Sequence, residues 1–212
     1  MPSEPESACR VVVGFMILGA AAIGIPYRLR ADRAGGRVSR QVDPAWFWIG
    51  MTLAGPPVAL TCLAFLIQPR WIDFAAFDAS PVLRLIGAPI ALAGIGLFAW
   101  MFRHLGLNVT STSIPRASAT LVTSGPYRWI RHPMYSATLL LVAAATLLTA
   151  NLVMALGGGA MFALLAARSR LEERRLVEKF GEAYRAYQRR AGRFVPRLPP
   201  AKNPGERGPA AD

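Results

Sequence analysis

The chain has 212 residues, is 53% hydrophobic and carries a formal net charge of +12 at pH 7. This length is that of one domain, and the only two cysteines, Cys9 and Cys62, argue against a disulfide framework or a zinc site. The arginines lie between apolar blocks and in the tail, a distribution typical of membrane-protein loops. We therefore interpret the charge as membrane topology and expect no nucleic-acid partner.

The first apolar segment covers residues 11–25 and is predicted to end before Pro26. Glu4 and Glu6 precede it, and an acidic start is wrong for a secretory signal. The loop that follows is predicted to be cytosolic, because its arginines (Arg28, Arg30, Arg33, Arg37 and Arg40) are offset only by Asp32 and Asp43. This topology places the N-terminus outside.

Residues 46–67 form the second apolar segment and residues 82–102 the third. Each has the roughly twenty residues that a bilayer requires. Pro56 and Pro57 should kink the second segment, which transmembrane helices tolerate. The third segment contains small residues that allow close contact between helices, namely Gly87, Gly94 and Gly96.

The fourth apolar segment, residues 135–167, is too long for one span and short for two. The polar run Thr149-Ala150-Asn151 in its middle predicts a tight hairpin. Each helix of the hairpin would have roughly sixteen residues, or about 24 Å. Both open ends would face the cytosol.

Residues 168–190 are highly charged, with apolar residues at a three-to-four spacing. This pattern predicts one basic tail helix with a face on the membrane or the bundle, while residues 201–212 are predicted to be disordered. The predicted fold class is therefore all-α. A single domain, residues 1–200, forms a polytopic integral membrane protein of about five transmembrane helices.

The segment SGPYRWIRHPMY, residues 124–135, is unlike an ordinary turn between helices, because it contains two prolines, three aromatic rings and two arginines. Pro133 suits the first position of a helix. His132 and Tyr135 would then lie at the N-terminal end of that helix, a place that favours anionic groups. The segment is a candidate site.

A second group of candidates lies after the predicted hairpin. Arg168 and Glu172 are four residues apart and share a helical face. A tight hairpin brings them to the start of its first helix, so they could ring one pocket with Tyr127, His132 and Tyr135. The alternatives are an ordinary helical ion pair and a belt of interfacial aromatic residues. No Walker loop, glycine fingerprint, catalytic triad or metal-ligand spacing occurs in the sequence.

Two motifs carry a family resemblance. LVTSGPYRWIRHPMY, followed after the hairpin by EERRLVEKFGEAYRAYQRRAGRFVP, resembles the C-terminal half of the isoprenylcysteine carboxyl methyltransferase family. That family is related to the membrane phospholipid methyltransferases. The resemblance covers about residues 105–196, the catalytic half, and the first three helices match only as generic spans.

The resemblance implies an integral membrane enzyme that takes S-adenosyl-L-methionine from the cytosol and a lipidic or prenylated acceptor from the bilayer. Arg168 and Glu172 would be catalytic, with Arg168 holding the carboxylate of an isoprenylcysteine-like acceptor. Glu173 could take the place of Glu172. Ala119 stands where the family often has histidine, so a contact there would come from the backbone. The residues implied to bind the cofactor are Ala119, Thr120, Leu121, Val122, Tyr127, His132, Pro133, Met134, Tyr135 and Glu172.

The sequence leaves several alternatives open. A carboxylate acceptor is already a nucleophile, whereas an amine must lose a proton, for which His132, Glu172 and Glu173 are candidates. Related sequences serve lipids and small thiols, so the acceptor is not decided. An NADPH-dependent membrane reductase of the steroid and sterol type carries a similar Arg-His-Pro-x-Tyr element, and a non-enzymatic membrane scaffold is the third reading. The oligomeric state is also undecided.

Overall fold

The computed structural model describes residues 4–35, 43–109 and 119–197. These residues form seven α-helices and three short 3-10 helices, and within them the only β-type pairings are two isolated bridges. The prediction of an all-α fold is confirmed. The elements are α1 (Glu4–Gly35), α2 (Ala45–Ile67), η2 (Pro69–Ala75), α3 (Pro81–Leu85), α4 (Gly87–Leu105), η3 (Gly106–Asn108), η4 (Gly125–Arg128), α5 (Pro133–Thr149), α6 (Leu152–Phe180) and α7 (Glu182–Arg190).

The helices have the length and apolarity of a polytopic membrane protein. Four stretches of the described chain are long and apolar enough to cross a bilayer, and α5 is a shorter apolar helix. Counted with α5, this agrees with the predicted five. The four stretches are Glu4–Ala34, Ala45–Ile67, Pro81–Asn108 and Leu152–Phe180. The predicted disordered tail, residues 201–212, lies outside the described residues, as do Arg37 and Arg40.

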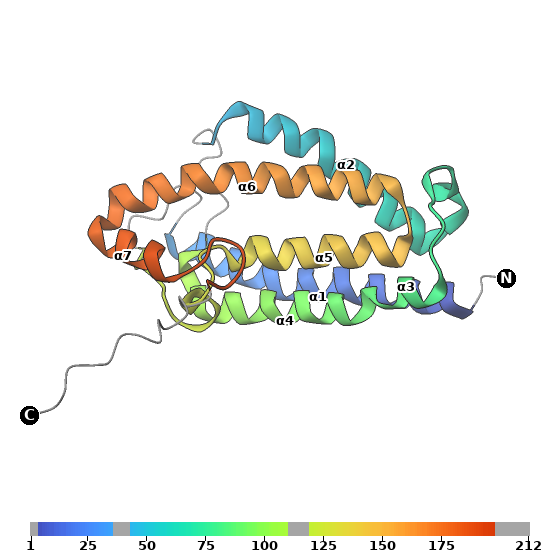
Figure 1. Cartoon of the computed structure of the whole chain (residues 1–212), viewed down its shortest axis with the longest axis horizontal. Helices are drawn as coiled ribbons and strands as arrows, with labels where there is room; N and C mark the ends of the chain where they lie inside the picture. The colour runs from blue at the N-terminus through green and yellow to red at the C-terminus, as the bar shows by residue number, and fades with distance from the viewer. Residues whose placement is uncertain (1–3, 36–42, 110–118, 198–212) are drawn as a thin grey trace, which may run out of the picture.

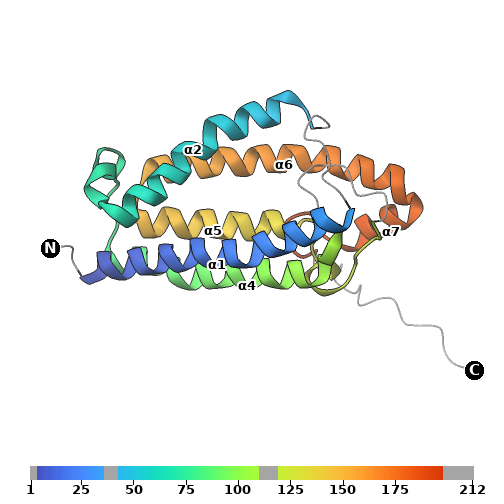
Figure 2. The ribbon, with the colours of Figure 1, turned by 180° about the vertical axis from the view of Figure 1, so that it is seen from behind.

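Figures 1 and 2 show α1, α4 and α5 running alongside one another, with α2 lying along α6 on the other side of the molecule. Small residues allow the close approach of α4 and α5: a Cβ atom added at Gly94 would lie 2.9 Å from the Leu141 side chain. The turn between α5 and α6 lies at one end of the bundle, and α7 lies at the other.

Three predicted helix boundaries were wrong. The first helix continues through Pro26 to Gly35, because a transmembrane helix can lose one backbone hydrogen bond at proline and the following residues favour helix. The third segment divides at Ile86 into α3 and α4, because the ring of Pro89 conflicts with the carbonyl four residues earlier. The charged helix is broken at Gly181, whose φ of +57° is accessible to glycine, and α7 then changes direction.

The predicted hairpin is confirmed, and its turn is tightly held. Ala150 adopts the left-handed conformation after α5 with a φ of +47°. Asn151 is fully buried: its side-chain oxygen accepts from the backbone N–H of Val153 at 2.9 Å, and its amide donates to the carbonyl of Ile72 at 2.8 Å. Arg84 donates to the carbonyl of Leu148, near the end of α5, at 2.8 Å. These bonds fix the hairpin at the end of the bundle opposite α7.

We predict that Asn151→Ala destabilises the protein by about 1–3 kcal/mol, because it removes the cap of α6 and leaves the carbonyl of Ile72 without that donor. Thermal unfolding in detergent measures the effect. Asp78→Ala is the control, since Asp78 is exposed near the same end and its loss should change stability by less than about 0.5 kcal/mol. Equal stability of the two variants would contradict the capping role.

Candidate active site

The loop that precedes α5 is held in place from both sides. Gly125 has a φ of +58°, and a Cβ atom there would lie 2.3 Å from the ring of His104 on α4. The His104 ring in turn lies 3.1 Å from the Ser124 hydroxyl, measured at Nδ1. Only glycine satisfies both the backbone conformation and this close contact, so the segment is fixed against α4.

The C-terminal segment after α7 pairs with the same loop. The backbone N–H of Arg131 donates to the carbonyl of Gly192 at 2.8 Å, and the N–H of Gly192 donates to the carbonyl of Trp129 at 2.9 Å. A Cβ atom at Gly192 would lie 1.9 Å from the carbonyl oxygen of Val195, so the turn requires glycine. The sequence analysis did not predict this pairing.

α7 adds two buried tyrosines to this end of the molecule. Tyr184 and Tyr187 are each 2% exposed and pack on Leu176 and Phe180. The Tyr187 hydroxyl donates to the carbonyl of Tyr127 at 2.6 Å. Burial raises the pKa of the Tyr127, Tyr184 and Tyr187 hydroxyls, so all three stay neutral at physiological pH.

Glu173 is the centre of a buried ion-pair network. Its carboxylate receives Arg131 Nε at 2.9 Å, His132 Nε2 at 3.1 Å and Arg193 Nη2 at 2.7 Å. Because a carboxylate only accepts, His132 carries its hydrogen on Nε2. The network joins α6, the loop before α5 and the C-terminal segment, and the Glu173 side chain is only 6% exposed. Glu173 is therefore a structural partner.

Glu172 points elsewhere. Its side chain is 29% exposed and lines the pocket, and its Oε2 accepts a hydrogen bond from the Tyr135 hydroxyl at 2.9 Å. His132 stacks on Tyr135 with ring planes 7° apart. Of the two adjacent glutamates that the sequence left as alternatives, Glu172 is the one that a ligand in the pocket can reach.

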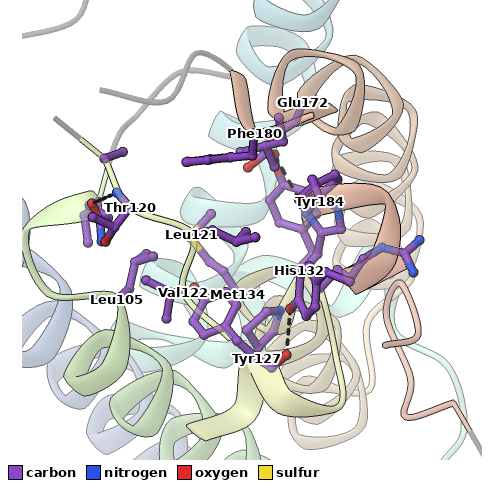
Figure 3. A pocket seen from close by; sticks show the side chains of 18 of the residues that line it. Leu105, Thr120, Leu121, Val122, Tyr127, His132, Met134, Glu172, Phe180 and Tyr184 are labelled. Atoms are coloured by element: carbon purple, nitrogen blue, oxygen red, sulfur yellow. Dashed lines mark hydrogen bonds and ion pairs between the residues drawn. The ribbon is translucent and has the colours of Figure 1, made fainter. Parts of the chain in front are cut away.

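All residues predicted to bind the cofactor line one pocket between the loop, α5, α6 and α7 (Figure 3). Counted with its open mouth, which includes solvent, the pocket has about 930 Å³ of space free of atoms. Apolar side chains from residues 121–122 and Met134 face Phe180, Tyr184 and Glu172 across it. The roles of these residues stay predictions. Those brought together are Ala119, Thr120, Leu121, Val122, Tyr127, His132, Pro133, Met134, Tyr135, Arg168 and Glu172.

Arg168 lies at the same pocket, deeply buried. Its Nη1 donates to the Tyr135 hydroxyl and its Nη2 to Asp43 Oδ2, both at 3.1 Å. The ring of Phe47 covers the guanidinium at 4.8 Å. The Tyr135 hydroxyl thus connects Arg168 to Glu172, and the expected ring of five side chains around one pocket is present.

Asp43 is the site residue that sequence reasoning missed. It was taken as a charge that offsets a basic loop, but its side chain is 0% exposed at the start of α2. Arg175 approaches its other oxygen at 3.7 Å. The sequence contained one signal for this role. Asp43 stands directly before Pro44 and the aromatic start of α2, so it lies where the loop joins the helix bundle.

Comparisons with known proteins find one matching family model and several partial relatives. Residues 82–183 match phospholipid methyltransferase. The chain is 41% identical over 80 residues to methanethiol S-methyltransferase of Pseudomonas deceptionensis, covering 37% of this chain and 29% of the relative. It is 40% identical over 121 residues to the cobalt-zinc-cadmium resistance protein CzcN of Cupriavidus metallidurans, covering 56% of this chain and 51% of the relative.

One solved structure has a similar fold. The fold of this chain is similar to the eukaryotic intramembrane Ras methyltransferase ICMT (isoprenylcysteine carboxyl methyltransferase), with a TM-score of 0.52 and 21% identity over 84% of this chain and 60% of that one. Residues 82–183, just under half of the chain, are thus similar to the phospholipid methyltransferases, and the fold is similar to that of the isoprenylcysteine carboxyl methyltransferase. It spans about half, or less, of the length of the curated relatives that it matches.

The match includes the loop before α5 and all of α6, the two elements that supply the pocket's charged side chains. It ends at residue 183, so most of α7 and the C-terminal segment that completes the Glu173 network lie beyond it. This similarity favours the methyltransferase interpretation over the membrane reductase and over the scaffold.

Glu172 and Glu173 provide a matched test of the two roles, pocket lining for Glu172 and structural ion pairing for Glu173. We predict that Glu173→Gln lowers stability by about 3–5 kcal/mol, because it leaves Arg131, whose side chain is 10% exposed, and the partly exposed Arg193 without their anion. Glu172→Gln should change stability by less than about 1 kcal/mol, because its partly exposed amide still accepts from Tyr135. Thermal unfolding of both variants in the same detergent measures the difference, and similar losses would contradict it.

Proposed function

We propose that this chain is an S-adenosyl-L-methionine-dependent membrane methyltransferase that acts on an acceptor from the bilayer. One observation carries the proposal: two motifs about forty residues apart in sequence meet at one pocket at the end of the bundle. Residues that a helical hairpin would not need for folding are thereby placed around a common space. The match to the methyltransferase family supports the same reaction.

The residues present fit the cofactor. Backbone groups of residues 119–122 and the apolar side chains of the pocket suit a nucleoside, and the partly exposed Glu172 carboxylate suits its cationic amino and sulfonium end. Tyr127, His132, Pro133, Met134 and Tyr135 would complete the binding surface. The bound cofactor supplies an activated methyl group. The protein's tasks are then to align the acceptor in line with it and to exclude water.

The acceptor has a route from the lipid. An apolar groove lies between α2 and α6. Its lining includes Trp46 and Ala167, which are next in sequence to Phe47 and Arg168. A lipid chain in this groove would bring its polar end to Arg168. The resemblance favours the carboxylate of an isoprenylcysteine-like lipid or, in the related enzymes, a phospholipid amine. The methanethiol S-methyltransferase relative favours a thiol.

Amine and thiol acceptors must lose a proton, and the geometry narrows the candidate bases. Glu173 is enclosed by Arg131, His132 and Arg193, which leaves Glu172 at the pocket. With its hydrogen on Nε2, His132 presents an unprotonated Nδ1 3.8 Å from Glu172, so the histidine is the second candidate base at the pocket.

The charges at the two ends of the bundle support a cytosolic site and an outside N-terminus. Arg28, Arg30 and Arg33 lie on the α1 end nearest the site, together with the arginines of the loop and of α6. At the opposite end, Glu4, Glu6, Asp73 and Asp78 offset Arg10, Arg70 and Arg84. This asymmetry is the one that the positive-inside rule describes.

Calorimetry on the detergent-purified protein tests the proposed reaction class. We predict that S-adenosyl-L-methionine binds and that Glu172→Gln weakens binding by at least about tenfold, because the cationic end loses its charged partner at a partly desolvated site. The matched control is Glu178→Gln, also on α6 but absent from the pocket lining, which should bind normally. Binding of NADPH in place of S-adenosyl-L-methionine would contradict the proposal, as would binding of neither.

Cysteine labelling in intact cells tests the orientation. In a background with Cys9 and Cys62 changed to alanine, a membrane-impermeant maleimide should label Asp78→Cys and not Glu182→Cys. Both positions are exposed, and they lie at opposite ends of the bundle. Permeabilised cells should show labelling of both. The reverse pattern in intact cells would place the pocket outside.

A further inference from the structure

The guanidinium that would hold a carboxylate acceptor already holds one. Asp43 Oδ2 lies 3.1 Å from Arg168 Nη2, and the side chains of the pair are 0% and 6% exposed. Arg168 Nη1 is bonded to the Tyr135 hydroxyl, and Phe47 covers the face of the guanidinium. Both terminal nitrogens therefore have an oxygen partner from the protein itself.

A second carboxylate would have to compete with Asp43 for Arg168. A guanidinium has five N–H donors, but a carboxylate bound in a forked pair would have to share at least one terminal nitrogen of Arg168 with Asp43 or Tyr135. The acceptor's anion would also approach Asp43, which is buried and held by Arg175 as well. Displacing Asp43 would leave a buried carboxylate without its main partner.

We infer that Asp43 is a specificity-determining residue that occupies the carboxylate position at Arg168, so that the acceptor carries a neutral nucleophile, an alkyl thiol, instead of a carboxylate. This rests on the proposed methyltransferase function. A protonated amine fits less well, because it would add a cation beside the guanidinium and the sulfonium. The thiol is neutral when it enters and meets no such repulsion.

The thiol reaction balances without a further reactant. The acceptor S–H bond breaks, and its proton passes to the Glu172 carboxylate and from there to water at the open mouth of the pocket. The acceptor sulfur forms a bond to the methyl carbon, and the methyl–sulfonium bond breaks with its electron pair kept by the departing neutral thioether. The buried ion pair of Arg168 and Asp43 lies beside the acceptor.

The test compares a lipid acid with its own ester. N-acetyl-S-farnesylcysteine supplies the carboxylate, its methyl ester is the neutral match, and 1-decanethiol is the thiol substrate. We expect the wild type to bind the ester at least about tenfold more tightly than the acid by calorimetry, and to methylate decanethiol with a kcat/KM at least about tenfold above that for the acid. Acid bound more tightly than ester, or methylated in preference to the thiol, would overturn the inference.

Variants at position 43 make the test specific. Asp43→Asn should shift the acid-to-ester binding ratio at least about tenfold toward the acid, because Arg168 would lose its anion. Asp43→Glu, which keeps the charge, should retain the wild-type ratio, and Asp78→Asn at the opposite end is the matched control. An unchanged ratio in Asp43→Asn would overturn the role of Asp43. If that variant does not fold, the wild-type comparison of acid, ester and thiol still decides.

The same preparations separate this inference from the proposed function. Absence of S-adenosyl-L-methionine binding would reject the methyltransferase itself. Cofactor binding together with a preference for the acid would reject only the assignment of Asp43.

Discussion

The site depends on one buried carboxylate that does not face it. Glu173 joins Arg131, His132 and Arg193, which belong to two segments separated by the whole α5–α6 hairpin. Without this anion, the arginines and the histidine would be uncompensated in a buried place, and the loop before α5 would lose its attachment to α6. The backbone pairing between Trp129 and Gly192 then adds directional bonds to the same junction. The network thus fixes the positions of Tyr127, His132 and Tyr135 before any ligand is present.

The two ends of the hairpin have opposite physical tasks. At the turn, Asn151 and Arg84 satisfy the backbone groups that the two helix ends leave exposed, so this end is closed by hydrogen bonds. At the other end, α5 begins with Pro133, and α6 continues past the apolar block into charged sequence. That extension places charged side chains beside the start of α5. A rigid turn at one end therefore supports a polar pocket at the other.

Much of this arrangement was predictable, because it follows from local pattern. The apolar segments gave the spans, and Thr149-Ala150-Asn151 gave the turn, which together predicted that Arg168 and Glu172 would meet His132 and Tyr135. Three features could not be predicted from the sequence. Pro26 lies in a helix whose flanking residues outweigh one lost hydrogen bond, whereas Gly181 breaks a charged helix by adopting a positive φ. Asp43 pairs with a residue 125 positions later, and no local periodicity reports such a contact.

α6 distributes its charges over two faces, and this explains why neighbouring glutamates differ. Arg168, Glu172 and Arg175 are spaced by four and three residues and share a face, whereas Glu173 is turned about 100° from Glu172. On the second face, Glu173 is fully engaged in its ion pairs with Arg131, His132 and Arg193. On the first face, Arg168 and Arg175 pair with Asp43, which lies just before α2. Glu172 is then the charged side chain that faces the open part of the pocket. The Glu172 carboxylate thus suits a cationic cofactor, and the bond between Asp43 and Arg168 suits an acceptor that does not need the guanidinium.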